Sequence, residues 1–163
     1  MTEPLISDGL ASSIREQIGH EFLNSHIYLY VAGFLKNKGL DNLAKIFEEQ
    51  YDEERKHGKI FFDLLTDLNT SVIIPAINAC EMEIVSILDV AQLYLDREIL
   101  TTKSLKEIRD LAMEDGNAVV EEKLRYMIGL QQNEYSESTS FMDSAELCGD
   151  DWWKVKVWND SLG

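Results

Sequence analysis

Four segments of the chain carry apolar residues at alternating steps of four and three positions, which is the spacing of one face of an α-helix. Each of these seams is interrupted near its middle by carboxylate, histidine or glutamine side chains. The seams are Ile14, Ile18, Glu21, Ser25, Tyr28, Ala32, Leu35; Leu43, Phe47, Gln50, Glu54, His57, Phe61, Leu64; Ile87, Ala91, Tyr94, Glu98, Thr101, Leu105, Ile108, Ala112; and Val120, Leu124, Met127, Gln131, Glu134, Ser138, Phe141, Ala145. The pattern predicts an all-α four-helix bundle with a polar site inside its core.

The breaks between the seams predict where the helices begin and end. Ser7 or Asp8 can cap the first helix, which we expect to end before Lys38-Gly39. The second helix is expected over about 41–68. Asp115-Gly116-Asn117 is a turn signal between the third and fourth helices. We therefore expect two antiparallel hairpins, one from the first pair of helices and one from the second.

A segment without helical periodicity, residues 69–85, separates the two hairpins. Fully extended, it would reach roughly 55 Å, whereas a helix of about 28 residues is roughly 42 Å long. The segment is thus long enough to cross back along the bundle, so the second and third helices can run parallel. One long crossover distinguishes this arrangement from a simple up-down bundle.

Carboxylates inside a bundle need a compensating charge, because a lone buried carboxylate loses several kcal/mol of hydration. The formal net charge of −15 favours cations as partners, although an acidic composition can also serve solubility alone. We expect no nucleic-acid partner and no membrane partner. The start of the chain lacks the pattern of a signal peptide, so a cytoplasmic protein with one domain over 1–163 is expected. Cys80 and Cys148 fall outside the seams and are expected to be free thiols.

The polar residues at the seam midpoints have the chemistry of a metal site. Glu54 and His57 are three residues apart, so a helix places the carboxylate and the imidazole on one face. Glu21, Glu98 and Gln131 lie near the middles of the other helices, and the middles of aligned helices meet whatever their direction. Carboxylates with an imidazole suit a pair of divalent ions. A Glu-x-x-His motif alone is weak evidence, but opposite two further seam glutamates it becomes strong.

The chain resembles the bacterial-type non-haem ferritins over about 8–146, leaving a short tail at 147–163. The resemblance rests on Glu21 with Tyr28, on Glu53 to His57, on Glu98, and on Gln131 to Glu134. It implies a ferritin-like bundle whose di-iron ferroxidase centre oxidises Fe(II) to Fe(III) with dioxygen or peroxide. It also implies a hollow homo-oligomer, with twenty-four subunits expected, that stores the ferric mineral.

By position, the resemblance also implies a role for each residue of the centre. Glu54 would bridge two irons, Glu21 and His57 would complete one iron position, and Glu98 would belong to the other. Gln131 would contact iron or its bound water weakly. Tyr28 would hydrogen-bond toward the centre and could donate an electron.

A third iron position, found in many bacterial ferritins, is in question for this chain. Glu53 and Glu134 are available for it, outside the two-iron core, but Leu130 and Asn133 stand where further carboxylates are expected. The alternative for Glu53 is a solvated place in the acidic stretch 48–54.

The last residues of the chain have no clear helical period. Residues 150–163 alternate in a way that fits a strand as well as a helix, and we expect their three tryptophans to pack at a subunit contact.

A bacterioferritin needs a second Glu-x-x-His and a methionine between Glu54 and His57; this chain has Arg55 and Lys56 there, so no haem is expected. The alternatives kept open are a di-iron oxidase or peroxidase without storage, of the rubrerythrin or bacterioferritin type, and a structural bundle.

Overall fold

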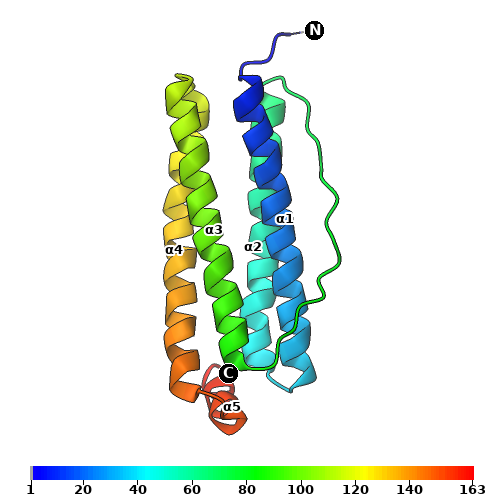
Figure 1. Cartoon of the computed structure of the whole chain (residues 1–163), viewed down its shortest axis with the longest axis vertical. Helices are drawn as coiled ribbons and strands as arrows, with labels where there is room; N and C mark the ends of the chain where they lie inside the picture. The colour runs from blue at the N-terminus through cyan, green and yellow to red at the C-terminus, as the bar shows by residue number, and fades with distance from the viewer. Residues whose placement is uncertain (1) are drawn as a thin grey trace.

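The computed structural model describes residues 2–163, and these form five helices and no strand (Figure 1). The helices are α1 (Asp8–Asn37), α2 (Asp41–Asp67), α3 (Ile87–Glu114), α4 (Ala118–Cys148) and α5 (Trp152–Ser161). The first four lie side by side, and α5 sits at one end of them. The predicted all-α four-helix bundle is confirmed. Within 2–163, no helix is both long enough and apolar enough to cross a membrane.

The topology is the one that the long connection predicted. α1 packs along α2, and α3 packs along α4, as two antiparallel hairpins. Residues 68–86 then run along the outside of the bundle and return the chain to the end at which α2 began (Figure 1). As a result, α2 and α3 are parallel, and the midpoints of all four helices lie at one level.

The connection is held against α1 by side chains along its length. Arg15 Nε donates to the carbonyl of Ser71 at 3.0 Å, and Tyr30 Oη donates to the carbonyl of Met82 at 2.7 Å. A Cβ atom on Gly19 would lie 2.6 Å from Cγ of Pro75, so this close approach requires glycine.

A side chain of the short helix α5 caps the first turn of α2. The residue before α2, Leu40, makes no side-chain cap. Asn159 of α5 supplies one instead: its Oδ1 accepts from Leu43 N at 2.9 Å, and its carbonyl accepts from Asn42 Nδ2 at 3.0 Å. An unmade cap costs a helix about 0.5–2 kcal/mol, so this contact ties the tail to the bundle.

The helical form of α5 decides between the two readings of the tail. Trp158 packs at a tilt against Phe141, with ring centroids 4.9 Å apart, and the ring of Trp152 lies 6.3 Å from that of Phe34. Two of the three tryptophans thus pack on their own chain. Trp153 is 74% exposed. Of the three tryptophans, Trp153 is therefore the one available for a contact with another subunit. The subunit contact itself stays a prediction.

Every predicted seam residue is buried. The apolar ones form two separate clusters, because the polar side chains at mid-bundle lie between them. The cluster on the α5 side includes Tyr28, Tyr94 and Phe141, and the other includes Ile14 and Phe61. The bundle therefore has a polar layer between two apolar cores.

Both cysteines are free thiols, as expected. The prediction that Cys148 lies outside the seams is wrong, however, because it is buried in the last turn of α4, three residues after Ala145. It continues the fourth seam by one step. Burial raises the pKa of its thiol.

Candidate metal centre

The polar layer gathers four carboxylates and one imidazole from all four long helices. Glu21 comes from α1, Glu54 and His57 from α2, Glu98 from α3 and Glu134 from α4, and each is at most 9% exposed. Their ligand atoms form two groups, within each of which the atoms lie within 4.8 Å of one another. The groups are Glu21, Glu54 and His57, and Glu54, Glu98 and Glu134. Glu54 belongs to both, which is the place of a ligand that bridges two ions.

The imidazole of His57 lies between carboxylates of two helices. Its Nδ1 is 4.0 Å from Oε2 of Glu21, and its Nε2 is 3.5 Å from Oε1 of Glu134. Glu21 is oriented from its own helix, because its Oε1 accepts a hydrogen bond from Gln17 Nε2 at 2.8 Å. The other oxygen of Glu21 is thereby left facing the centre.

Glu98 is oriented by two hydrogen bonds from other helices. Tyr28 of α1 donates its hydroxyl to Oε1 of Glu98, and Gln131 of α4 donates Nε2 to Oε2 at 2.6 Å. Tyr28 thus lies where it was predicted, hydrogen-bonded toward the centre. Gln131 directs its amide nitrogen to a neighbouring carboxylate. Both residues therefore hold Glu98 in place.

The centre gathers carboxyl groups in the interior of the bundle, largely away from water. Burial first, and then the neighbouring Glu21, raises the pKa of Glu54 well above its usual range. Burial and then Glu98 raise the pKa of Glu134 to about 9. The pKa of Glu98 is raised as well, because burial outweighs its hydrogen bonds from Tyr28 and Gln131. Carboxyl groups in such a setting hold protons until a cation replaces them.

Three carboxylate oxygens of the centre are buried without a hydrogen-bond partner among the residues that the structure describes. They are Oε2 of Glu21, Oε1 of Glu54 and Oε2 of Glu134. Buried polar atoms are rarely left unpaired, so each orphan indicates a missing ligand. One orphan lies on each side of the shared Glu54, and one on Glu54 itself. Carboxylates with one imidazole are a donor set that suits divalent metal ions, so the residues fit a dinuclear site.

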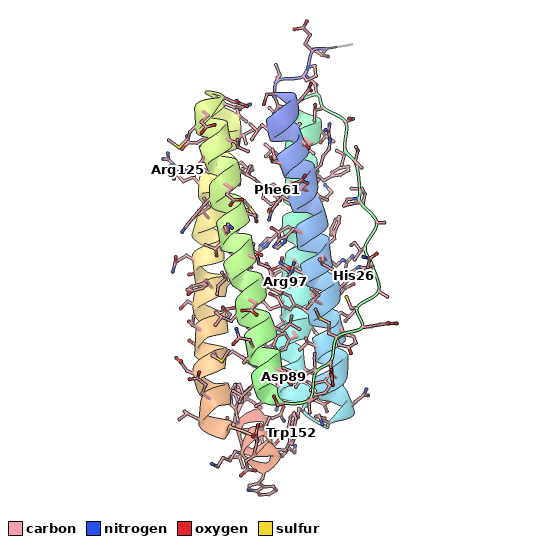
Figure 2. All side chains as sticks on the ribbon, in the orientation of Figure 1. His26, Phe61, Asp89, Arg97, Arg125 and Trp152 are labelled. Atoms are coloured by element: carbon pink, nitrogen blue, oxygen red, sulfur yellow. The ribbon has the colours of Figure 1, made fainter. Side chains whose placement is uncertain are left out.

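A hydrogen-bonded network that the sequence reasoning missed reaches the shared carboxylate from α1 and α3. Asn24 Nδ2 lies 3.4 Å from Oε2 of Glu54 and donates to Thr101 Oγ1 at 3.0 Å. Arg97 Nε donates to Oδ1 of Asn24 at 2.7 Å, and Figure 2 shows Arg97 at mid-bundle between α3 and α1. His20 Nε2 is 2.6 Å from Thr101 Oγ1. Asn24 therefore links a cationic side chain to the ligand common to both groups.

The sequence did contain a signal for part of this network. Gln17 and Asn24 lie four residues before and three residues after Glu21, so they share its helical face. Polar residues at these steps from a predicted ligand are candidates for its hydrogen-bond partners. Arg97 carried no such signal, because it lies outside the seam of α3.

Only one of the two acids predicted for a third iron position belongs to a ligand group. Glu134 lies inside the second ligand group, whereas the sequence reasoning put it outside the two-iron core. The side chain of Glu53 is 46% exposed, accepts from Lys56 Nζ at 2.7 Å, and joins neither group. The solvated alternative for Glu53 thus matches its position.

Comparison with known proteins agrees with this architecture. The family described as the ferritin-like domain matches residues 11–147. A protein of Staphylococcus epidermidis named bacterial non-heme ferritin is 28% identical over 147 residues, which cover 90% of this chain and 89% of that protein. One of Staphylococcus aureus with the same name is 23% identical over 159 residues, covering 98% and 96%. Among solved structures, an open pore ferritin from the archaeon Archaeoglobus fulgidus has a similar fold, with TM-score 0.91 and 22% identity over 96% of this chain and 97% of that one.

Proposed function

The chain belongs to the ferritin-like domain family, and on this premise we propose that it is an iron-storage ferritin that oxidises Fe(II) at the centre formed by its four long helices. One observation carries the oxidation step: Glu54 is shared by two ligand groups whose acids have buried, unpartnered oxygens. A centre built only for stability would not leave such oxygens unpaired.

In the proposed reaction, Fe(II) is the substrate and two ions bind at once. Glu21, Glu54 and His57 would hold one ion, and Glu54, Glu98 and Glu134 would hold the other. A shared carboxylate keeps two metals about 3.5–4 Å apart in two-metal sites generally. Each Fe(II) gives up one electron, so the pair reduces one dioxygen to hydrogen peroxide, or one peroxide to water, with uptake of two protons.

The surrounding residues have distinct tasks in this proposal. The buried carboxyl groups would release their protons when Fe(II) binds, so the negative charge of the carboxylates would balance the charge of the metal. Burial and the neighbouring Glu98 raise the pKa of Tyr28 well above its usual range. Its phenol therefore stays protonated, and the hydroxyl donates a hydrogen bond to Glu98. In this proposal the phenol ring, which can be oxidised, would lie beside the second ion position. Asn24, braced by Arg97, would keep Glu54 in its bridging orientation.

Storage requires an enclosed space, which one chain of this shape does not form. We propose a hollow homo-oligomer, of about twenty-four copies as the family resemblance implies, with Trp153 at a contact between subunits. A ring that is 74% exposed on an isolated chain is a natural candidate for burial between chains.

Particle size together with iron content tests the storage proposal. Protein supplied with Fe(II) in air should elute as a large closed oligomer that holds many more irons than two per subunit. A small oligomer that oxidises Fe(II) without retaining it would favour a di-iron oxidase or peroxidase. A small oligomer that does neither would favour a structural bundle.

A further inference from the structure

A second layer of oxygen-bearing side chains lies one helical turn from the centre, on the α5 side. Gln50 precedes Glu54 by four residues on α2, and Tyr94 precedes Glu98 by four on α3. Glu137 follows Glu134 by three residues on α4, which runs in the opposite direction. Each step corresponds to about 5 Å along a helix. Three of the four long helices thus each carry a second polar side chain, one turn away from the ligand that they provide to the centre.

These three side chains line one cavity of about 420 Å³, whose walls come from α2, α3, α4 and α5. Gln50 is 6% exposed and Tyr94 is 1% exposed, so both lie at its floor. Oε1 of Gln50 and the hydroxyl of Tyr94 are buried without a hydrogen-bond partner among residues 2–163. Nε2 of Gln50 donates to Oε2 of Glu137 at 3.3 Å, so its amide is held with Oε1 free. Two orphaned oxygens in one cavity indicate a missing ligand.

The residues that line the cavity favour a cation as its ligand. The other lining residues with polar groups are Glu49, three serines and Trp158, and no lysine, arginine or histidine lines the cavity in the described part of the chain. A cavity with two carboxylates and no basic group repels anions. Carbonyl, hydroxyl and carboxylate oxygens are the ligands of hard divalent cations, which keep several of their own waters. The volume leaves room for those waters.

We propose that this cavity binds a partly hydrated divalent cation through Gln50, Tyr94 and Glu137, and that Fe(II) rests there on its way to the dinuclear centre. The identity of the ion as Fe(II) rests on the proposed function, whereas the binding site does not. The residues differ from Glu53 and Glu134, which the sequence offered for a third iron position. The site lies one turn from ligands of both proposed ion positions, so a short transfer would deliver the ion.

Cobalt provides a probe that binds without being oxidised in air at neutral pH. Equilibrium dialysis of the assembled protein against Co²⁺ should show three ions per wild-type subunit. Glu137→Gln and Tyr94→Phe each remove one proposed ligand with little change of shape. Loss of groups that only support a ligand weakens metal binding by about 10–100-fold, so each variant should weaken one Co²⁺ by about tenfold or more and leave two unchanged.

The control is Glu122→Gln, which removes the same charge from an exposed position at the other end of α4. It should bind Co²⁺ as the wild type does. Anomalous scattering at the cobalt edge should place the third ion beside Oε1 of Gln50. Melting temperature and particle size, measured on each variant, separate a lost ligand from a lost fold, and Tyr94→Phe keeps the packed ring.

The outcome also separates this site from the proposed function. Glu54→Ala should lose the two ions of the centre and keep the ion in the cavity. If folded Glu137→Gln and Tyr94→Phe bound Co²⁺ as tightly as the wild type, with no anomalous peak in the cavity, the cation site would be disproved while ferroxidation stood. If the cavity ion were found but the wild type did not oxidise Fe(II), the site would stand and the proposed function would fail.

Discussion

Nε2 of His57 on α2 lies 3.5 Å from Oε1 of Glu134 on α4. The imidazole proposed for one iron position therefore lies close to a carboxylate proposed for the other. Both side chains are largely buried, with exposed fractions of 5% for His57 and 9% for Glu134. Glu134 consequently lies within the cluster of buried candidate ligands, and this changes what we expect its replacement to do.

Glu134→Ala should slow the first oxidation of Fe(II), and not only the later growth of mineral. It removes a ligand from the second group, so we expect the initial rate to fall by about tenfold or more. Stopped-flow absorbance of the ferric product measures this rate. The matched control is Glu53→Gln on the exposed side of α2, which should remain within about twofold of wild type. The reverse ranking of the two variants would return Glu134 to a position outside the core.

Asn24→Ala should weaken the centre without removing any ligand. The substitution leaves Arg97 Nε without its acceptor and removes the amide that donates to Glu54 Oε2 at 3.4 Å. An unpartnered buried group costs about 1–3 kcal/mol, and loss of a side chain that orients a ligand costs about 10–100-fold in metal affinity. Co²⁺ titration and thermal melting measure the two effects. Asn133→Ala, at an exposed position of α4, is the control. Unchanged Co²⁺ affinity in Asn24→Ala would show that the network does not position Glu54.

Metal-free protein should lose stability as the pH rises above about 4.5. The pKa of Glu134 is raised from 4.5 to about 9, so over this range the folded chain binds a proton that the unfolded chain has released. Stability from such a group is complete below the unfolded pKa and is lost as the pH approaches the folded one. The slope is at most about 1.4 kcal/mol per pH unit and per group.

Glu134→Gln, which does not titrate, should have a flatter profile of unfolding free energy against pH. Chemical unfolding of metal-free protein between pH 5 and pH 9 measures both profiles. Adding Co²⁺ should reverse the trend for the wild type, because metal binding is favoured when the carboxyl groups lose their protons. Equal slopes in the two proteins would show that Glu134 does not carry the proton.

Protein produced with ample haem should contain none. Arg55 and Lys56 lie between Glu54 and His57, where the bacterioferritin pattern has a methionine. Both side chains form exposed ion pairs, with Asp52 and Glu53 respectively, so they lie on the surface of α2. The absorbance spectrum of the purified protein should lack a Soret band. A band of stoichiometric intensity would revive the bacterioferritin alternative.

Periodicity was enough to predict the bundle, because burial in a helical core follows the same steps of three and four that the sequence displays. Glu98, an acid among apolar neighbours, was recognisable for the same reason, and it is fully buried. The tail was different. Ten residues of α5 allow either period, and its helix is held by contacts that no local pattern contains, chiefly the burial of Val155 and the cap that Asn159 provides for α2.

The centre was predictable up to the point where distances between helices matter. Spacing along α4 puts Gln131 and Glu134 on one face but does not say which reaches the second ion position. The structure turns Gln131 to Glu98 and brings Glu134 into the ligand group. Likewise, Arg97 approaches Asn24 across two helices. Such pairings depend on side-chain conformations and on the crossing of α1 and α3, which sequence spacing does not determine.

The initial rate of Fe(II) oxidation by Glu54→Ala is the most direct test of the central claim, because Glu54 alone belongs to both ligand groups. We expect the rapid formation of ferric product seen by stopped-flow absorbance to disappear. Metal-free Glu54→Ala should melt at the same temperature as the wild type or higher, since it has one fewer buried acid among mutually repelling acids. A folded Glu54→Ala that oxidised Fe(II) at the wild-type initial rate would contradict a dinuclear centre at this site.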